Sequence, residues 1–279
     1  MQQRGALASR PSGNGRQTGS SWTTSAPDAT INTVQESRQV SVPSIAAVRS
    51  AGSVRLSMRD YFSTNFLWSA LRTSRLVGEL ETAKGNQPRF DMAHRSYAAS
   101  SVIASATFLE AAISELFQDA SDGHGLRDDG YLAPLASDVV ARMAIIWRAT
   151  EQGRSLKPAE KWQWLLECAG YARLDPGTAP ARDALLLVQL RNVLVHFKPE
   201  DISAEEEHAL TKRLRGKFPD NKLAAGSGNP WWPSHGLGHG CTGWAVRSAR
   251  TLADHVFTGV GINPNYRRVE AAGWIGGEP

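Results

Sequence analysis

Residues 95–121, RSYAASSVIASATFLEAAISELFQDAS, are the most strongly patterned stretch of this chain. Their large apolar side chains recur at about 100° per residue, the period of an α-helix that buries one face. These side chains are Val102, Ile103, Ala106, Leu109, Ile113, Leu116 and Phe117. An isolated helix cannot cover such a face, so the sequence predicts that other helices pack against it.

Several further stretches have the same helical period. We expect helices over residues 58–84, 130–153, 158–170, 180–197, 203–217 and 241–258. Pro158 opens one of these stretches, whereas Gly85 and Gly170 end two others. No strand-like alternation and no internal repeat is found. The sequence therefore predicts an all-α helical bundle over 57–262 and a flexible C-terminal tail over 263–279.

The first 56 residues differ in composition from the rest. They are rich in Ser, Thr, Gly and Gln and contain six arginines and two acidic residues. Such a composition buries too little apolar surface to order itself, so we expect a disordered tail over 1–56. Organelle transit peptides share this composition, but Pro11 and Gly13 interrupt the amphipathic helix that they need.

Charge and cysteine content limit the class of protein. Without the tail, the 31 basic and 27 acidic residues of the chain become 25 of each, so the body is formally neutral. A neutral body argues against coating nucleic acid through overall charge, although a local basic patch stays compatible with it. Cys168 and Cys241 are too few for a disulfide framework and indicate reduced thiols in a cytoplasmic protein. Uninterrupted apolar runs fall short of the roughly 20 residues that span a bilayer.

The segment LRNVLVHFKPE, residues 190–200, places polar groups in an apolar run. The predicted helix 180–197 is apolar on nearly all sides, which indicates a central helix. Gln189, Asn192 and His196 form one stripe about 60° wide, and Arg191 lies about 140° from His196 around the axis. A site that uses Arg191 and His196 together therefore needs a bend near Pro199 or a second chain. The alternative is a buried polar stripe that fixes the register of the helix.

Glu110 lies at the edge of the apolar face of helix 95–121, whereas Glu115 is expected on the solvent side. A carboxylate at the edge of a core favours a nearby cation, and we predict that Arg191 is this partner. The alternative is that Glu110 extends into solvent.

The loop HGLGHGC, residues 235–241, supplies His235, His239 and Cys241, three candidate metal ligands. Three ligands in a glycine-rich loop, without a paired C-x-x-C or H-x-x-x-H, favour a tight turn in which Cys241 starts a helix. We expect no metal and no cofactor. Trp231 and Trp232 are expected to pack on the bundle, the alternative being that they stack on a nucleic-acid base.

Arg191, Asn192 and His196, at the end of an apolar helix, resemble the R-X4-6-H signature of the HEPN superfamily. The resemblance extends over about residues 95–260 and includes SYAASSVIASATFLEAAISELF, EKWQWLLECAG and NPWWPSHGLGHGCTGWAVRSA. It implies an HEPN-like bundle and a metal-independent endoribonuclease, a toxin or defence effector that leaves a 2′,3′-cyclic phosphate. Arg191 would hold the RNA phosphate, His196 would act as general acid or base, and Asn192 would orient His196 or the phosphate. Glu110 and Gln189 would support this site.

The resemblance also implies partners. HEPN-like ribonucleases are commonly homodimers with a composite cleft, and an antitoxin or nucleotidyltransferase-type protein is expected as a partner; no membrane is expected. The alternative is a non-catalytic helical module that dimerises or binds a partner, with the same residues as buried polar packing. The two hypotheses differ in exposure, because an enzyme needs Arg191 and His196 to reach solvent.

Overall fold

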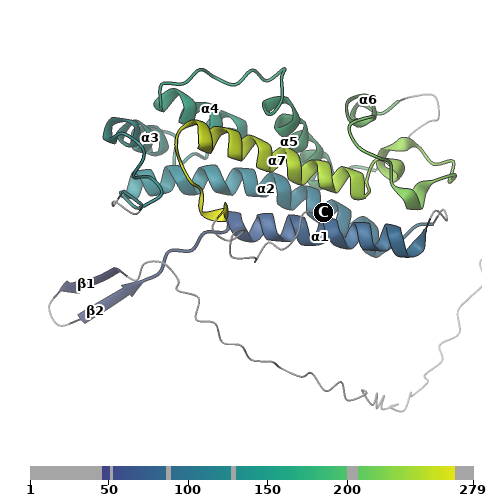
Figure 1. Ribbon diagram of the computed structural model, residues 1–279, viewed down its shortest axis with the longest axis horizontal. Helices are drawn as coiled ribbons and strands as arrows, with labels where there is room; N and C mark the ends of the chain where they lie inside the picture. The colour runs from purple at the N-terminus through teal and green to yellow at the C-terminus, as the bar shows by residue number, and fades with distance from the viewer. Residues whose placement is uncertain (1–45, 51–52, 86–88, 127–129, 200–206, 268–279) are drawn as a thin grey trace, which may run out of the picture. The chain divides into compact units, whose positions relative to one another are not determined.

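The computed structural model describes residues 46–50, 53–85, 89–126, 130–199 and 207–267 (Figure 1). The chain divides into two compact units, Met1–Met58 and Arg59–Pro279. The first unit contains β1 (Ala46–Ser50) and β2 (Ser53–Ser57), an antiparallel pair in which Ala46 lies opposite Ser57. This hairpin corrects the prediction of an unstructured tail for its residues. Residues 1–45 of the predicted tail lie outside the described residues.

The second unit is helical, and its described residues contain no strand. The helices are α1 (Ser63–Lys84), α2 (Met92–Asp122), α3 (Ser137–Ala149), α4 (Pro158–Cys168), α5 (Ala181–Val195), α6 (Ala209–Leu214) and α7 (His239–Gly259). Two short turns, η1 (Lys222–Ala224) and η2 (Trp231–His235), lie between α6 and α7. The prediction of an all-α bundle is confirmed for this unit.

The ends of the helices follow from local chemistry. The Asp91 carboxylate accepts a hydrogen bond from the backbone N–H of His94 and starts α2 three residues before the predicted point. Gly123, with φ 69°, ends it in the left-handed conformation that suits glycine. Pro158 is the first residue of α4, and the Glu160 side chain accepts from the N–H of Lys157 at 2.7 Å.

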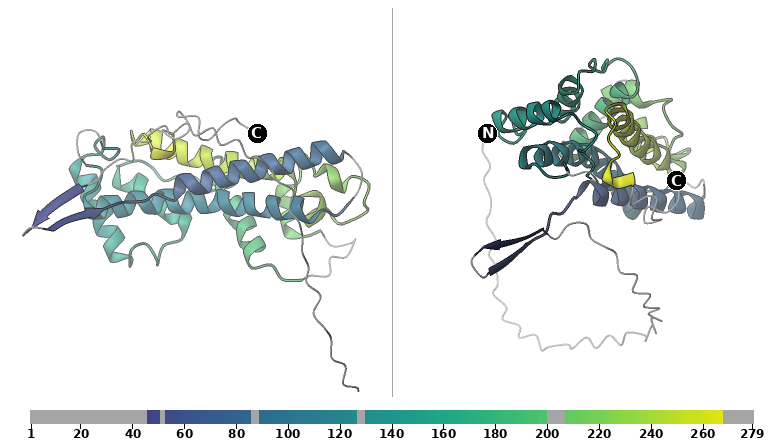
Figure 2. Two further views of the ribbon diagram at one scale, coloured as in Figure 1. Left: turned by 90° about the horizontal axis from the view of Figure 1, so that it is seen from below. Right: turned by 60° about the vertical axis from the view of Figure 1, so that its left-hand side comes forward.

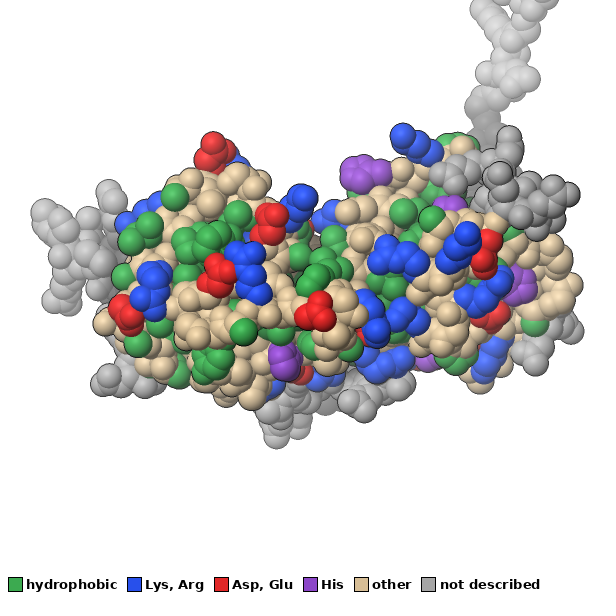
Figure 3. Space-filling view, turned by 90° about the horizontal axis from the view of Figure 1, so that it is seen from above, with side chains coloured by type: hydrophobic (Ala, Val, Ile, Leu, Met, Phe, Trp, Pro, Cys, Tyr) green, Lys and Arg blue, Asp and Glu red, His purple; other side chains and the backbone are tan. Residues whose placement is uncertain are grey.

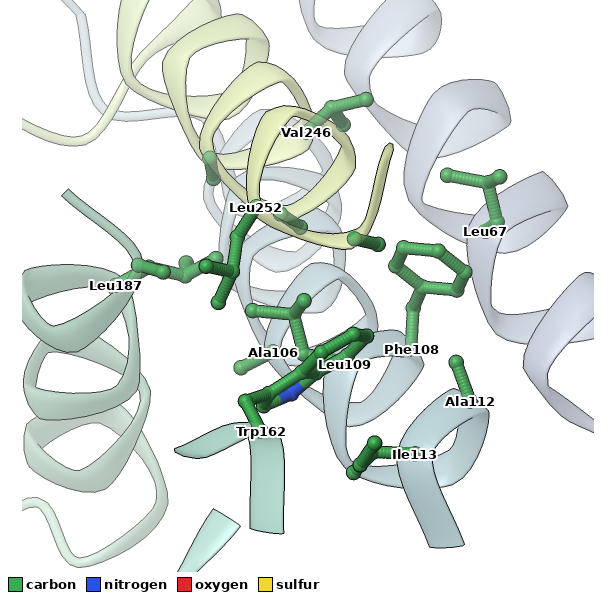
Figure 4. Close-up of a cluster of buried hydrophobic side chains, with 14 of the residues drawn as sticks. Leu67, Ala106, Phe108, Leu109, Ala112, Ile113, Trp162, Leu187, Val246 and Leu252 are labelled. Carbon is green, nitrogen blue, oxygen red and sulfur yellow. The ribbon is translucent and has the colours of Figure 1, made fainter. Parts of the chain in front are cut away.

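α2 is the central helix of the unit. It packs against α1, α3, α4, α5 and α7, and in Figures 1 and 2 it runs through the middle of the bundle. Figure 4 shows Leu109 of α2 among Trp162 of α4, Leu187 of α5 and Leu252 of α7. By length and composition α2 is also apolar enough to cross a membrane, but 61% of that window is buried inside the unit, as in the core helix of a soluble protein.

Glu115 is not on a solvent face of α2, contrary to the prediction. Its carboxylate accepts hydrogen bonds from the backbone N–H and the hydroxyl of Ser63, at 2.8 and 2.5 Å. It thereby satisfies one of the free N–H groups at the start of α1. Burial raises the pKa of Glu115 above the ordinary value, against the opposing effect of these hydrogen bonds.

The ordered chain continues beyond the predicted bundle end at residue 262. Tyr266 is buried, and its hydroxyl donates to Asp254 of α7 at 2.9 Å. Arg267 donates to the same carboxylate. Residues 263–267 therefore belong to the helical unit and not to a flexible tail, and 268–279 lie outside the described residues.

Candidate active site at the end of α5

α5 buries only its first two thirds. Its buried residues are Ala181, Ala184, Leu186, Leu187 and Leu190. Beyond Leu190 the helix reaches the surface, and Val195 and Phe197 are 48% and 55% exposed. The prediction that the whole helix is central is therefore wrong, because Val193 and Leu194 meet the core only in part and Val195 does not meet it.

The polar residues of α5 are also at the surface. Gln189, Asn192 and His196 are exposed, and Arg191 is half-buried. His196 follows the last residue of α5, and its backbone N–H donates to the carbonyl of Asn192 at 2.9 Å. A buried polar stripe within one chain is therefore ruled out.

Arg191 pairs with Glu110, as the sequence predicted. Its Nη2 lies 3.2 Å from Glu110 Oε2, and its Nη1 donates to Asn192 Oδ1 at 2.9 Å. Both side chains of the ion pair remain partly open to water, at 27% for Arg191 and 39% for Glu110. The pair fixes the direction of the guanidinium, and water screening limits its contribution to stability to at most about 1 kcal/mol.

A basic segment lies along the side of α5 that carries Asp183 and Gln189. Residues 212–217, at the end of α6 and just after it, are KRLRGK. Arg213 donates to the side-chain oxygen of Gln189, and Lys217 Nζ lies 2.9 Å from Asp183 of α5. In Figure 3, Lys and Arg side chains gather on the right half of the face, the half that carries α6 in Figure 1. A formally neutral body thus carries basic side chains next to Gln189, of which Arg215 and Lys217 are paired with Glu207 and Asp183.

Arg191 and His196 do not meet within one chain. Over the described part of the molecule, no hydrogen bond joins their side chains. The narrow hollow along α5 is lined by Ala181, Ala184, Leu185 and Val188 of its first half and reaches neither residue. One chain therefore presents the Arg191 guanidinium and the His196 imidazole as two separate groups at the end of α5.

The three candidate metal ligands are kept apart. Among the described residues, no group of His, Cys, Asp and Glu is arranged to hold a metal ion. The His239 N–H donates to Glu81 Oε1 at 2.7 Å, and its ring Nδ1 lies 3.0 Å from the carbonyl of Ser74. Cys241 is fully buried in the first turn of α7, where desolvation raises the pKa of its thiol. His235 contacts Ser227 instead.

The glycines of this loop are required by close packing. A Cβ on Gly240 would lie 2.2 Å from the carbonyl oxygen of Pro219, and one on Gly238 would lie 2.7 Å from the Cα of Asn221. Real side chains do not reach such distances. The predicted tight turn at the start of a helix is confirmed.

Trp231 and Trp232 are buried, at 9% and 2% exposure. The indole N–H of Trp231 donates to Asp220 at 2.9 Å, and its ring stacks on Phe218. The predicted packing on the bundle is confirmed, and stacking on a nucleic-acid base is ruled out for these rings as they stand.

One polar cluster was not predicted from the sequence. Glu81 of α1 and His94 of α2 are each 3% exposed, and His94 Nε2 lies 3.0 Å from Glu81 Oε1. Burial alone would raise the pKa of Glu81, but hydrogen bonds from His94 and from the His239 backbone outweigh it and hold the pKa below the ordinary value. Because the two residues belong to different helices, no spacing in the sequence indicates their contact.

Comparison with models of known families, with curated proteins and with solved structures finds no match to this chain. The residues and their geometry are therefore the basis for the functional argument.

Proposed function

We propose that this protein is an HEPN-like, metal-independent endoribonuclease of the cytoplasm, in which Arg191 and His196 act on an RNA phosphate. One observation carries the proposal: both side chains reach solvent at the same end of α5, and the basic segment 212–217 contacts the same helix at Gln189. That segment supplies positive charge for the RNA backbone without requiring a basic body.

The residue types suit the chemistry. His196 takes the proton from a ribose 2′-hydroxyl, and the 2′-oxygen forms a bond to the adjacent phosphorus. The bond from phosphorus to the 5′-oxygen breaks, and a protonated histidine returns a proton to that leaving oxygen. Arg191 holds the phosphate and neutralises its developing charge. The products are a 2′,3′-cyclic phosphate and a free 5′-hydroxyl.

Asn192 and Glu110 position Arg191 in this scheme. They accept hydrogen bonds from two different nitrogens of its guanidinium, at 2.9 and 3.2 Å. Their contacts orient the guanidinium plane before RNA binds, which reduces the entropic cost of binding. Gln189 holds Arg213 of the basic segment in the same way.

A second copy of the chain completes the site. Within one chain Arg191 faces Glu110 and His196 lies past the end of α5, so one copy brings only half of the groups together. The exposed apolar side chains of Val195 and Phe197 flank His196 and supply a contact surface for the second copy. Facing α5 ends would place Arg191 of one copy near His196 of the other.

The test is cleavage of a labelled RNA in EDTA by the full chain, with His196→Ala and Arg191→Ala as variants. Loss of the general acid or base is expected to slow cleavage by about 10²–10⁴-fold. His255→Ala is the matched control, since His255 is an exposed histidine on α7, and it should cleave at the wild-type rate. No cleavage by the wild type, or equal cleavage by His196→Ala, would exclude this function.

A second candidate function is a non-catalytic module that uses the end of α5 to bind a partner, such as an antitoxin or a nucleotidyltransferase-type protein. The observation that favours it is that Arg191 and His196 do not meet within one chain, which a non-catalytic module does not require. Its contact surface would be the exposed pair Val195 and Phe197. Replacing Val195 and Phe197 by serine should then abolish binding of the partner. His196→Ala should leave this binding, and the effect of the protein on cell growth, unchanged.

A further inference from the structure

A hollow of about 330 Å³ lies at the start of α2, far from the end of α5. Its walls come from α2 and from the segment of η1 and η2, which Figures 1 and 2 show in green beside the end of α1. The lining includes Arg89, His94, Arg95, Asn221, Ser234 and Leu237. This volume lies within the range of small-molecule sites, which begins at about 300 Å³.

Two arginines give the hollow an uncompensated positive charge. The guanidinium groups of Arg89 and Arg95 form no hydrogen bond or ion pair with another described residue. Arg95 lies over the ring of Phe90 at 5.7 Å, which fixes its position without neutralising it. The carboxylate in the lining, Asp91, is already bound to Lys84 and to the backbone of His94.

His94 contributes an oriented imidazole to the same hollow. Its Nε2 faces Glu81 at 3.0 Å, and Glu81 is itself held by the backbone N–H of His239 at 2.7 Å. A buried carboxylate that contacts one ring nitrogen fixes the orientation of the ring, so His94 forms a fixed part of the wall of the hollow.

We propose that this hollow binds a small phosphate ester of about the size of a nucleoside monophosphate. Arg89 and Arg95 hold the phosphate oxygens through charge-assisted hydrogen bonds. The organic part lies against Leu237 and the exposed Phe90 ring. The site is separate from the end of α5, because Arg95 and Glu110 stand about 22 Å apart along α2 at a rise of about 1.5 Å per residue.

The test is isothermal titration of the full chain with adenosine 5′-monophosphate, adenosine and inorganic phosphate. The monophosphate should bind saturably and adenosine should not, because the two arginines recognise the phosphate. Arg89→Gln and Arg95→Gln should each weaken binding by about 10- to 100-fold, the range for a hydrogen bond to a charged group. Arg72→Gln is the matched control, as an exposed arginine of α1 outside the hollow.

Each outcome decides the proposal. Equal binding of adenosine, equal losses in Arg72→Gln and Arg95→Gln, or no saturable binding at millimolar concentration would overturn it. Because Arg89 and Arg95 are not buried, their glutamine variants should fold, which circular dichroism checks. His196→Ala should bind the monophosphate as the wild type does, so failure of the ribonuclease proposal and failure of this site are distinguishable.

Discussion

Replacing Glu81 by alanine removes a carboxylate that joins α1, α2 and α7. Two buried donors lose their acceptor, the His94 imidazole at 3.0 Å and the His239 N–H at 2.7 Å. Removing one partner of a buried pair typically costs about 3–5 kcal/mol. For a unit of this size, that loss corresponds to a fall in melting temperature of about 10 °C.

The measurement is urea unfolding followed by tryptophan fluorescence, and Glu79→Ala is the matched control. Glu79 lies two residues away on α1 but is exposed, so its replacement should change stability by no more than about 0.5 kcal/mol. Equal stability of Glu81→Ala and Glu79→Ala would refute the reasoning, because it would mean that the buried contacts contribute nothing.

The contribution of Glu81 to stability depends on pH with a definite sign. The pKa of Glu81 is held below its ordinary value of 4.5 in the folded state, so its ionised form contributes stability above that pH. This contribution is lost as the pH falls through the folded-state pKa. The stability difference between wild type and Glu81→Gln should therefore be full at neutral pH and shrink in acid. A difference that is constant from neutral pH into the acid range would contradict the assignment.

Three further predictions concern other parts of the helical unit. Gly240→Ala should destabilise it by about 1–3 kcal/mol in urea unfolding, because the new Cβ meets the carbonyl of Pro219 at 2.2 Å. Cys241 should not react with a thiol reagent until the unit unfolds, since burial raises the pKa of its thiol and excludes the reagent. Glu110→Ala should cost no more than about 1 kcal/mol, because water screens its pair with Arg191, but it should lower RNA cleavage.

Controls exist for each of these. Gly259→Ala, at the end of the same helix, should change stability by no more than about 0.5 kcal/mol, since nothing lies within 4 Å of its Cβ position. Cys168→Ser isolates the signal of Cys241. A Glu110→Ala variant that unfolds at much lower urea would show that the pair is structural rather than a positioning device.

The helices were predictable because their signals are local. The period of residues 95–121, Pro158 at the start of a helix and Gly85 after another each depend on a few neighbouring residues. Which other helices cover each face of a helix was not predictable in this way, because it depends on residues far away in the chain. Glu115 lies opposite the apolar face of α2, but α1 covers that side and supplies Ser63 as its donor.

In the candidate site, too, local features were predictable from the sequence and the surroundings of the helix were not. The pairing of Arg191 with Glu110 was predicted from the need of an edge carboxylate for a cation, and the structure contains it. The burial of α5 was mispredicted. The angles of the residues around the helix axis show that Val195 and Phe197 extend the apolar surface of α5, but they do not show where along the axis the core ends. The contact of Glu81 with His94 depends on how two helices are placed side by side, which their own sequences do not encode locally.

The central place of α2 has a consequence for synthesis of the protein. Its contacts with α7 join residues far apart in the chain, as do the bonds from Thr242 to Ser74 and from His239 to Glu81, over 168 and 158 positions. On a ribosome, α1 and α2 emerge long before α7 is made, an interval on the order of ten seconds at typical rates. During that interval the apolar side of α2 meant for α7 is open to chaperones and to other nascent chains. Variants that weaken α7 are therefore expected to lower the yield of folded protein before they alter its activity.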